Sequence, residues 1–147
     1  MRFLIIYWIT ILSCSGNDNT PHQNEKLQPY FIEVAAELAD RGMHVPVQHI
    51  NIYMKPISRT GFIGFWRPSD RSITIDSYTY YTYNRADSKE LYILIAHELA
   101  HSVGVPHISC GSVYHPMRDS WQAMPNHITL EDIYDMIAEE YFRQQIK

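Results

Sequence analysis

Apolar residues recur along the chain at two different spacings, and each spacing predicts one kind of element. Residues 28–41 carry an apolar side chain every three or four positions, which is helical spacing, and Gly42 follows as a C-cap. From Val47 to Lys55 apolar and polar residues alternate, which predicts a strand. The core-facing side chains of that strand are expected to be Ile50, Ile52 and Met54.

A hairpin is predicted in the next part of the chain. Gly61–Trp66 is apolar and aromatic, Pro68–Asp70 has the composition of a turn, and Ser72–Asp76 is rich in β-branched residues. We expect the first of these two strands to lie at the edge of the sheet. The Tyr and Thr cluster at 78–83 is compatible with a strand end or with a packed loop.

Two further helices are predicted towards the C-terminus. Asp87 and Glu90 form a D-x-x-E capping box, which starts a helix that runs to about Val103. Thr129 and Asp132 begin the last helix. The buried stripe of that helix would contain Ile133, Met136, Ile137 and Tyr141. Together these elements predict an α+β domain with a small sheet and three main helices.

The N-terminal residues have the pattern of a secretory signal. A run of ten residues from Phe3 to Leu12 is apolar except for Thr10, and it is too short to cross a bilayer of ~30 Å as a helix. The run ends in Ile-Leu-Ser-Cys, which resembles the lipobox of bacterial lipoproteins. This resemblance implies that residues 1–13 are a signal peptide, that Cys14 is lipidated, and that the protein is anchored to a membrane of the bacterial cell envelope. An ordinary signal peptide with an incidental cysteine is the alternative.

Composition and charge indicate the extent of the domain and the kinds of partner it can have. Residues 14–27 are polar and are expected to form a flexible tether, which leaves residues 28–147 as one domain. The chain carries 12 Lys and Arg against 16 Asp and Glu, a formal charge of −4. Because a nucleic-acid surface requires clustered positive charge, we expect no nucleic-acid partner. We expect a monomer.

One eleven-residue segment carries the candidate chemistry. It contains His97, Glu98, His101, Gly104 and His107 in the pattern H-E-x-x-H-x-x-G-x-x-H. The first two histidines are four residues apart, so they project from one face of a helix. Gly104 permits the chain to turn out of the helix and to bring His107 back towards them. Three imidazoles suit one Zn²⁺ ion and leave a coordination position open, beside which Glu98 can lie.

This segment resembles the metzincin clan of zinc metallopeptidases. The clan has a methionine turn below the metal, and the resemblance assigns that role to Met117, with Met124 as the second candidate. His115 precedes this turn, and we expect it to stabilise the turn by a hydrogen bond rather than to bind metal. The chain from residue 128 to 135 is similar to the last helix of the matrixins. The resemblance implies a twisted mixed sheet and a zinc-binding helix among the three main helices.

The resemblance also implies an activity, which is zinc-dependent endopeptidase hydrolysis of protein or peptide substrates. A metal-activated water would attack the peptide carbonyl, with Glu98 as general base and then general acid. The substrate would pair with the edge strand at Gly61, Phe62, Ile63 and Gly64. Trp121 is expected either to line the substrate pocket or to anchor the core. The alternative functions are a surface-anchored zinc-binding protein without proteolysis, and a peptidase that cleaves a single partner.

Overall fold

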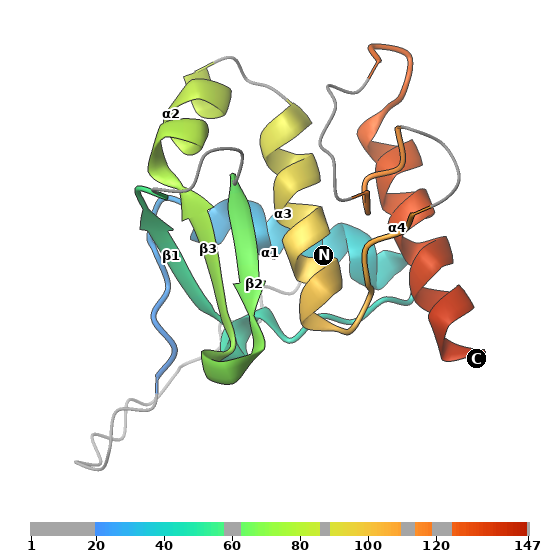
Figure 1. Cartoon of the computed structure of the whole chain (residues 1–147), viewed down its shortest axis with the longest axis horizontal. Helices are drawn as coiled ribbons and strands as arrows, with labels where there is room; N and C mark the ends of the chain where they lie inside the picture. Colours follow the sequence, from blue (N-terminus) through green and yellow to red (C-terminus); the bar gives the residue numbers. More distant parts are fainter. Residues whose placement is uncertain (1–19, 58–62, 86–88, 110–113, 119–124, 147) are drawn as a thin grey trace, which may run out of the picture.

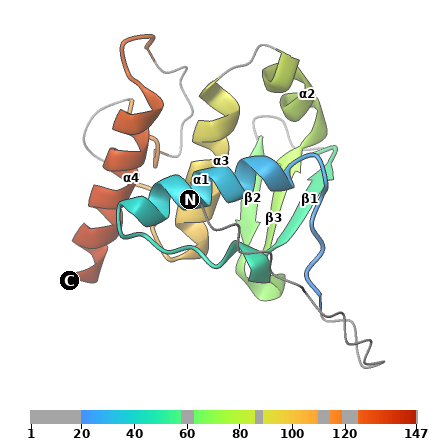
Figure 2. The ribbon, with the colours of Figure 1, turned by 180° about the vertical axis from the view of Figure 1, so that it is seen from behind.

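The chain folds into a small mixed sheet and four helices in the part that the structure describes. This computed structural model describes residues 20–57, 63–85, 89–109, 114–118 and 125–146. The helices are α1 (Gln28–Asp40), α2 (Ser77–Arg85), α3 (Lys89–Ser102) and α4 (Leu130–Gln145), and the strands are β1 (Asn51–Lys55), β2 (Gly64–Arg67) and β3 (Ser72–Asp76). Figure 1 shows α3 between the sheet and α4, and Figure 2 shows α1 running across the back of the molecule from the strands to α4.

The three strands have the order β1-β3-β2, with β1 parallel and β2 antiparallel to β3. The predicted mixed sheet and the predicted hairpin are therefore both confirmed, and β2 lies at an edge. The turn between the hairpin strands is a short 3₁₀ helix, Pro68–Asp70, which ends at Arg71 with a φ of 49°. All five residues of β3 are buried, because this strand has a neighbour on each side and helices on one face.

The segment before α1 is packed against the domain, although the sequence places it in a flexible tether. Leu27 is fully buried in the core. The Asn24 N–H donates to the Ile52 carbonyl at 3.1 Å, and the Ile52 N–H donates to the His22 carbonyl at 2.6 Å. The Gln23 side chain also donates to the backbone of Ile50 at 2.5 Å. These bonds satisfy the outer edge of β1, so the packed part of the chain extends upstream of the expected boundary at residue 28.

The start of one predicted strand and the structure expected for residues 78–83 are wrong for identifiable reasons. The strand expected from Val47 begins at Asn51, because Val47–His49 forms a 3₁₀ turn and the pairing with β3 starts only at Asn51. The 78–83 cluster is neither a strand end nor a loop but part of α2. Asp76 starts that helix by accepting the Thr79 N–H at 2.8 Å, a cap that outweighs the modest helix propensity of Thr and Tyr.

The helices that flank the site have the ends that the sequence predicts. α1 ends at Asp40, and Gly42, with a φ of 82°, follows it as the sequence predicts for a C-cap. α4 begins with the predicted capping box, in which Thr129 accepts the Asp132 N–H at 3.1 Å and Asp132 accepts the Thr129 N–H at 2.7 Å. The Asp87 box lies outside the described residues. α3 is buried over most of its surface, since it contacts the sheet, α1, α2 and α4.

Substitution of Leu27 by Ala tests whether the segment before α1 belongs to the folded domain. Because the side chain is fully buried, its truncation should lower the free energy of unfolding by about 2–5 kcal/mol. Denaturant unfolding of the full chain measures this loss. Glu25→Ala is the control, since Glu25 is exposed and its loss should change stability by less than about 0.5 kcal/mol. Equal stability of the two variants would show that the segment does not pack.

Candidate metal centre

The end of α3 brings the three predicted histidines together. His97 and His101 lie on the same face of the helix, and Gly104, with a φ of 91°, turns the chain out of it. The Gly104 N–H donates to the His101 carbonyl at 3.0 Å, and the Val105 N–H donates to the Ala100 carbonyl at 3.0 Å. This pair of bonds is a Schellman motif, which terminates the helix and directs the following residues back towards it.

The Nε2 atoms of the three rings form a nearly equilateral triangle. The separations are 2.9 Å between His97 and His101, 3.0 Å between His101 and His107, and 3.1 Å between His97 and His107. Two nitrogens on one tetrahedral zinc at 2.0–2.1 Å would lie about 3.3 Å apart, so the triangle fits one ion with a small expansion. Among the described residues, these three are the side chains that come close enough together to share a metal ion.

Hydrogen bonds on the far side of two rings fix which nitrogen faces the centre. His97 Nδ1 lies 2.6 Å from the Pro116 carbonyl oxygen, and His101 Nδ1 lies 2.7 Å from the Val105 carbonyl oxygen. A carbonyl oxygen only accepts, so each Nδ1 must carry the proton and each neutral ring presents a bare Nε2. Two lone pairs therefore face each other at 2.9 Å, which is unfavourable unless a proton or a cation lies between them.

The environment of His97 favours the neutral ring. This side chain is 7% exposed, and burial, together with the neighbouring rings of His101 and His107, lowers its pKa to about 3. The Pro116 carbonyl acts in the opposite direction but is outweighed. A cation that accepts the lone pairs is therefore the group that suits the centre. Exposure rises from His97 through His101 to His107, which is exposed, so the centre opens to solvent on the His107 side.

Glu98 is a buried carboxylic acid next to the first histidine. It is 4% exposed, its Oε2 has no hydrogen-bond partner, and burial raises its pKa to about 8 although the Trp66 backbone N–H lowers it. A nearby dication would lower the pKa again by stabilising the charged form. β2 provides the space for this carboxyl, because a Cβ at Gly64 would lie 3.2 Å from Glu98 Oε1.

The turn that contains Met117 lies directly against the histidines. Met117 is fully buried, and the preceding residue, Pro116, supplies the carbonyl that accepts the His97 Nδ1–H bond. His115 accepts the Met117 N–H at 3.1 Å, which confirms the turn-stabilising bond expected from the sequence. The carbonyls of Pro116 and Val105 and the N–H of Trp66 are backbone groups, so no residue type in the sequence could have indicated them.

The other predicted site residues divide between those that the structure describes and those that it does not. Ile63 directly precedes β2, and Gly64 begins it and faces Glu98. The remaining predictions lie outside the described residues, namely Cys14, Gly61, Phe62, Trp121 and Met124. In the part of the chain that the structure describes, no helix has the length and apolar character needed to span a bilayer.

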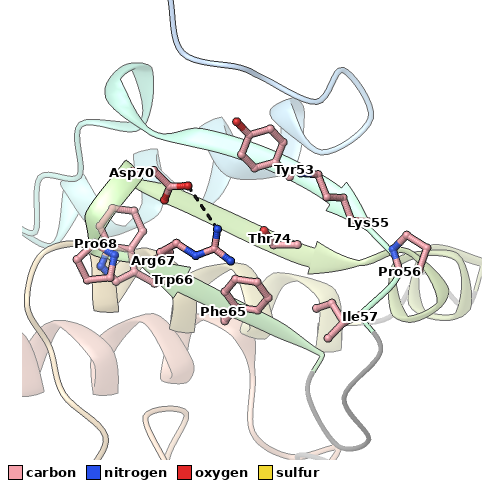
Figure 3. Close-up of a pocket in the computed structure, with 10 residues that line it drawn as sticks. All are labelled: Tyr53, Lys55, Pro56, Ile57, Phe65, Trp66, Arg67, Pro68, Asp70 and Thr74. Carbon is pink, nitrogen blue, oxygen red and sulfur yellow. Dashed lines mark ion pairs between the residues drawn. The ribbon is translucent and has the colours of Figure 1, made fainter.

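A separate hollow of about 650 Å³ lies on the other face of the sheet (Figure 3). Tyr53 and Phe65 flank Thr74 in register across the three strands, so long side chains on the outer strands border a short one in the middle. Arg67 points over this hollow and pairs with Asp70 at 3.5 Å. Because successive side chains of β2 alternate between its faces, the strand separates the hollow from Glu98.

Comparison of the chain with protein-family models, with curated proteins and with solved structures found no match. The residues that carry the candidate chemistry are the three histidines with converging Nε2 atoms and Glu98, whose buried Oε2 has no hydrogen-bond partner among the described residues.

Metal titration tests the centre directly. The chain should bind one equivalent of Zn²⁺, and His107→Ala should weaken that affinity by more than the roughly 10–100-fold loss that is typical for an outer-shell partner, because it removes one of three ligands. Competition with a chromophoric chelator measures both affinities. His49→Ala is the matched control, since His49 is exposed and is not part of the cluster. Wild-type affinity in His107→Ala would exclude the three-histidine centre.

Proposed function

We propose that this protein is a zinc-dependent endopeptidase of the metzincin type. The observation that carries the proposal is the combination of three converging imidazole nitrogens with a buried carboxyl on the same helix. His97, His101 and His107 would hold the ion. Three neutral imidazoles leave a coordination position free, as in catalytic rather than structural zinc sites. A zinc ion held there would act as a Lewis acid towards a substrate carbonyl and would lower the pKa of a bound water.

Glu98 supplies the proton transfer in this mechanism. Its carboxylate would take a proton from water as the oxygen bonds to the substrate carbonyl carbon, and the protonated acid would return that proton to the amine as the C–N bond breaks. The unpartnered Oε2 supports this role, because the surrounding protein leaves that oxygen available to a ligand. The close contact with Gly64 restricts where the carboxyl can lie.

The edge strand β2 is the element that suits an extended substrate. Among the residues that the structure describes, it pairs only with β3, so a peptide can add along its other edge. Gly64 at the start of this strand contacts Glu98, so a peptide added along this edge would pass close to the proposed base. Backbone pairing requires no particular side chains, which fits an endopeptidase that accepts varied sequences.

A zinc-binding protein without proteolysis remains the second candidate from the sequence. Glu98 distinguishes the two functions, because a metal scaffold has no use for a buried carboxyl with one unsatisfied oxygen. The signal peptide at residues 1–13, the lipid at Cys14 and the cell-envelope location belong to the same proposal, and they rest on the sequence pattern alone.

Glu98→Gln separates hydrolysis from metal binding. The amide cannot accept the proton, so cleavage of unfolded casein should fall by at least about 10²-fold while zinc binding is kept. A fluorescent casein assay and metal analysis of the same preparation provide the measurements. Glu90→Gln is the control, because it makes the same change of charge in the first turn of α3. Full activity of Glu98→Gln would exclude Glu98 as the base, and absence of cleavage by the wild-type chain would favour the binding protein.

Gly64→Ala tests whether β2 determines the position of the Glu98 carboxyl. The added methyl group would meet Leu94 at 3.1 Å as well as Glu98 at 3.2 Å, and displacement of a reacting group by 1 Å can cost about 10²-fold in rate. We expect kcat/KM to fall at least tenfold with zinc stoichiometry unchanged. Phe65→Leu, on the opposite face of the same strand, should retain most of the activity. Equal rates for wild type and Gly64→Ala would show that this contact does not position Glu98.

A further inference from the structure

The turn of residues 115–118 supports two of the three histidines. Its Pro116 carbonyl accepts the Nδ1–H of His97 at 2.6 Å. Its Met117 carbonyl accepts the N–H of Ile108 at 2.9 Å, and Ile108 directly follows His107. Ile108 and Arg118 also form an isolated parallel bridge. The position of the turn therefore determines both the ring orientation of His97 and the path of the chain at His107.

His115 ties this turn to α4. Its Nδ1 accepts the Met117 N–H at 3.1 Å, so in the neutral ring the proton is on Nε2. Burial, followed by the charge of Arg143, lowers the pKa of His115, which favours the neutral ring, while a hydrogen bond with the Met136 backbone acts in the opposite direction. Arg143 and Met136 both belong to α4, so the His115 ring lies close to this helix.

The His115 ring therefore has partners on two elements. Its Nδ1 accepts within the turn, and the backbone of Met136 in the middle of α4 lies beside the ring. The nitrogen that accepts the Met117 N–H is not available to a metal, which agrees with a supporting role for this histidine.

We propose that His115 is a positioning residue of the metal centre, which holds the 115–118 turn against α4 and thereby holds His97 and His107 in ligating geometry. The inference rests on the proposed metal site. Outer-shell groups that orient ligands typically change metal affinity by about 10–100-fold. His115 acts one step further away, through the Pro116 carbonyl and the Met117 backbone.

Three substitutions of His115 in the full chain test this role. His115→Ala removes both bonds and should raise the Kd for Zn²⁺ by about tenfold or more. His115→Asn keeps a side-chain acceptor for the Met117 N–H, and His115→Gln keeps a donor that reaches towards Met136. Each should recover part of the lost affinity. The absorption spectrum of the Co²⁺-loaded chain should change in His115→Ala, because the ligands are no longer held in one geometry. His127→Ala, an exposed histidine before α4, should match the wild type.

The outcomes distinguish this inference from the proposed function. If wild type and His115→Ala bind Zn²⁺ within twofold of each other, His115 does not position the centre, while the centre itself stands. A lower unfolding midpoint of the metal-free chain with an unchanged Co²⁺ spectrum would assign His115 a purely structural role. If His115→Ala fails to fold, the His115→Asn and His115→Gln variants provide the test. Wild-type zinc affinity and a wild-type Co²⁺ spectrum in both variants would overturn the proposal. A wild-type chain that binds neither metal would overturn the proposed function itself.

Discussion

The arrangement of the site depends on two hydrogen bonds that are made by the Nδ1 atoms of His97 and His101, on the far side of each ring from the Nε2 atoms that would bind the metal. Because the carbonyls of Pro116 and Val105 hold the Nδ1 protons of His97 and His101, two bare nitrogens are fixed 2.9 Å apart in a largely buried position. Lone pairs at that distance repel unless a proton or a cation lies between them. The same two bonds also select the tautomers that bind zinc. The remaining features of the site maintain this geometry.

α3 can hold such groups because the rest of the fold surrounds it. The sheet, α1, α2 and α4 all contact this helix, and its buried side chains include His97 and Glu98 as well as apolar residues. Burying one carboxyl oxygen without a hydrogen bond costs on the order of 1–3 kcal/mol, and the apolar side chains around α3 have to offset that cost. Gly64 provides space for this carboxyl, since a larger residue at this position of β2 would occupy the volume of the carboxyl.

The sequence predicted the elements better than their contacts. Helical spacing located α1 and α4, and alternation located β1 apart from its first residues, because these are properties of a single segment. The α2 helix was missed because its start depends on the Asp76 cap rather than on the apolar pattern. Spacing alone also placed His97, His101 and His107 together. The bond to Pro116, the packing of the segment before α1 and the contact between Gly64 and Glu98 join distant parts of the chain, so no local pattern could reveal them.

The gradient of exposure across the histidines bears on what kind of metal site this is. A structural zinc site is closed by four protein ligands, whereas here the described residues offer three and the outermost of them, His107, is exposed. A substrate can therefore approach from the side of His107, while His97 and Glu98 are buried in a medium of low polarity. Electrostatic interactions between an ion, a carboxylate and a developing charge are stronger in such surroundings than in water. An exposed metal ligand together with a buried proton acceptor is the combination that the proposed hydrolysis requires.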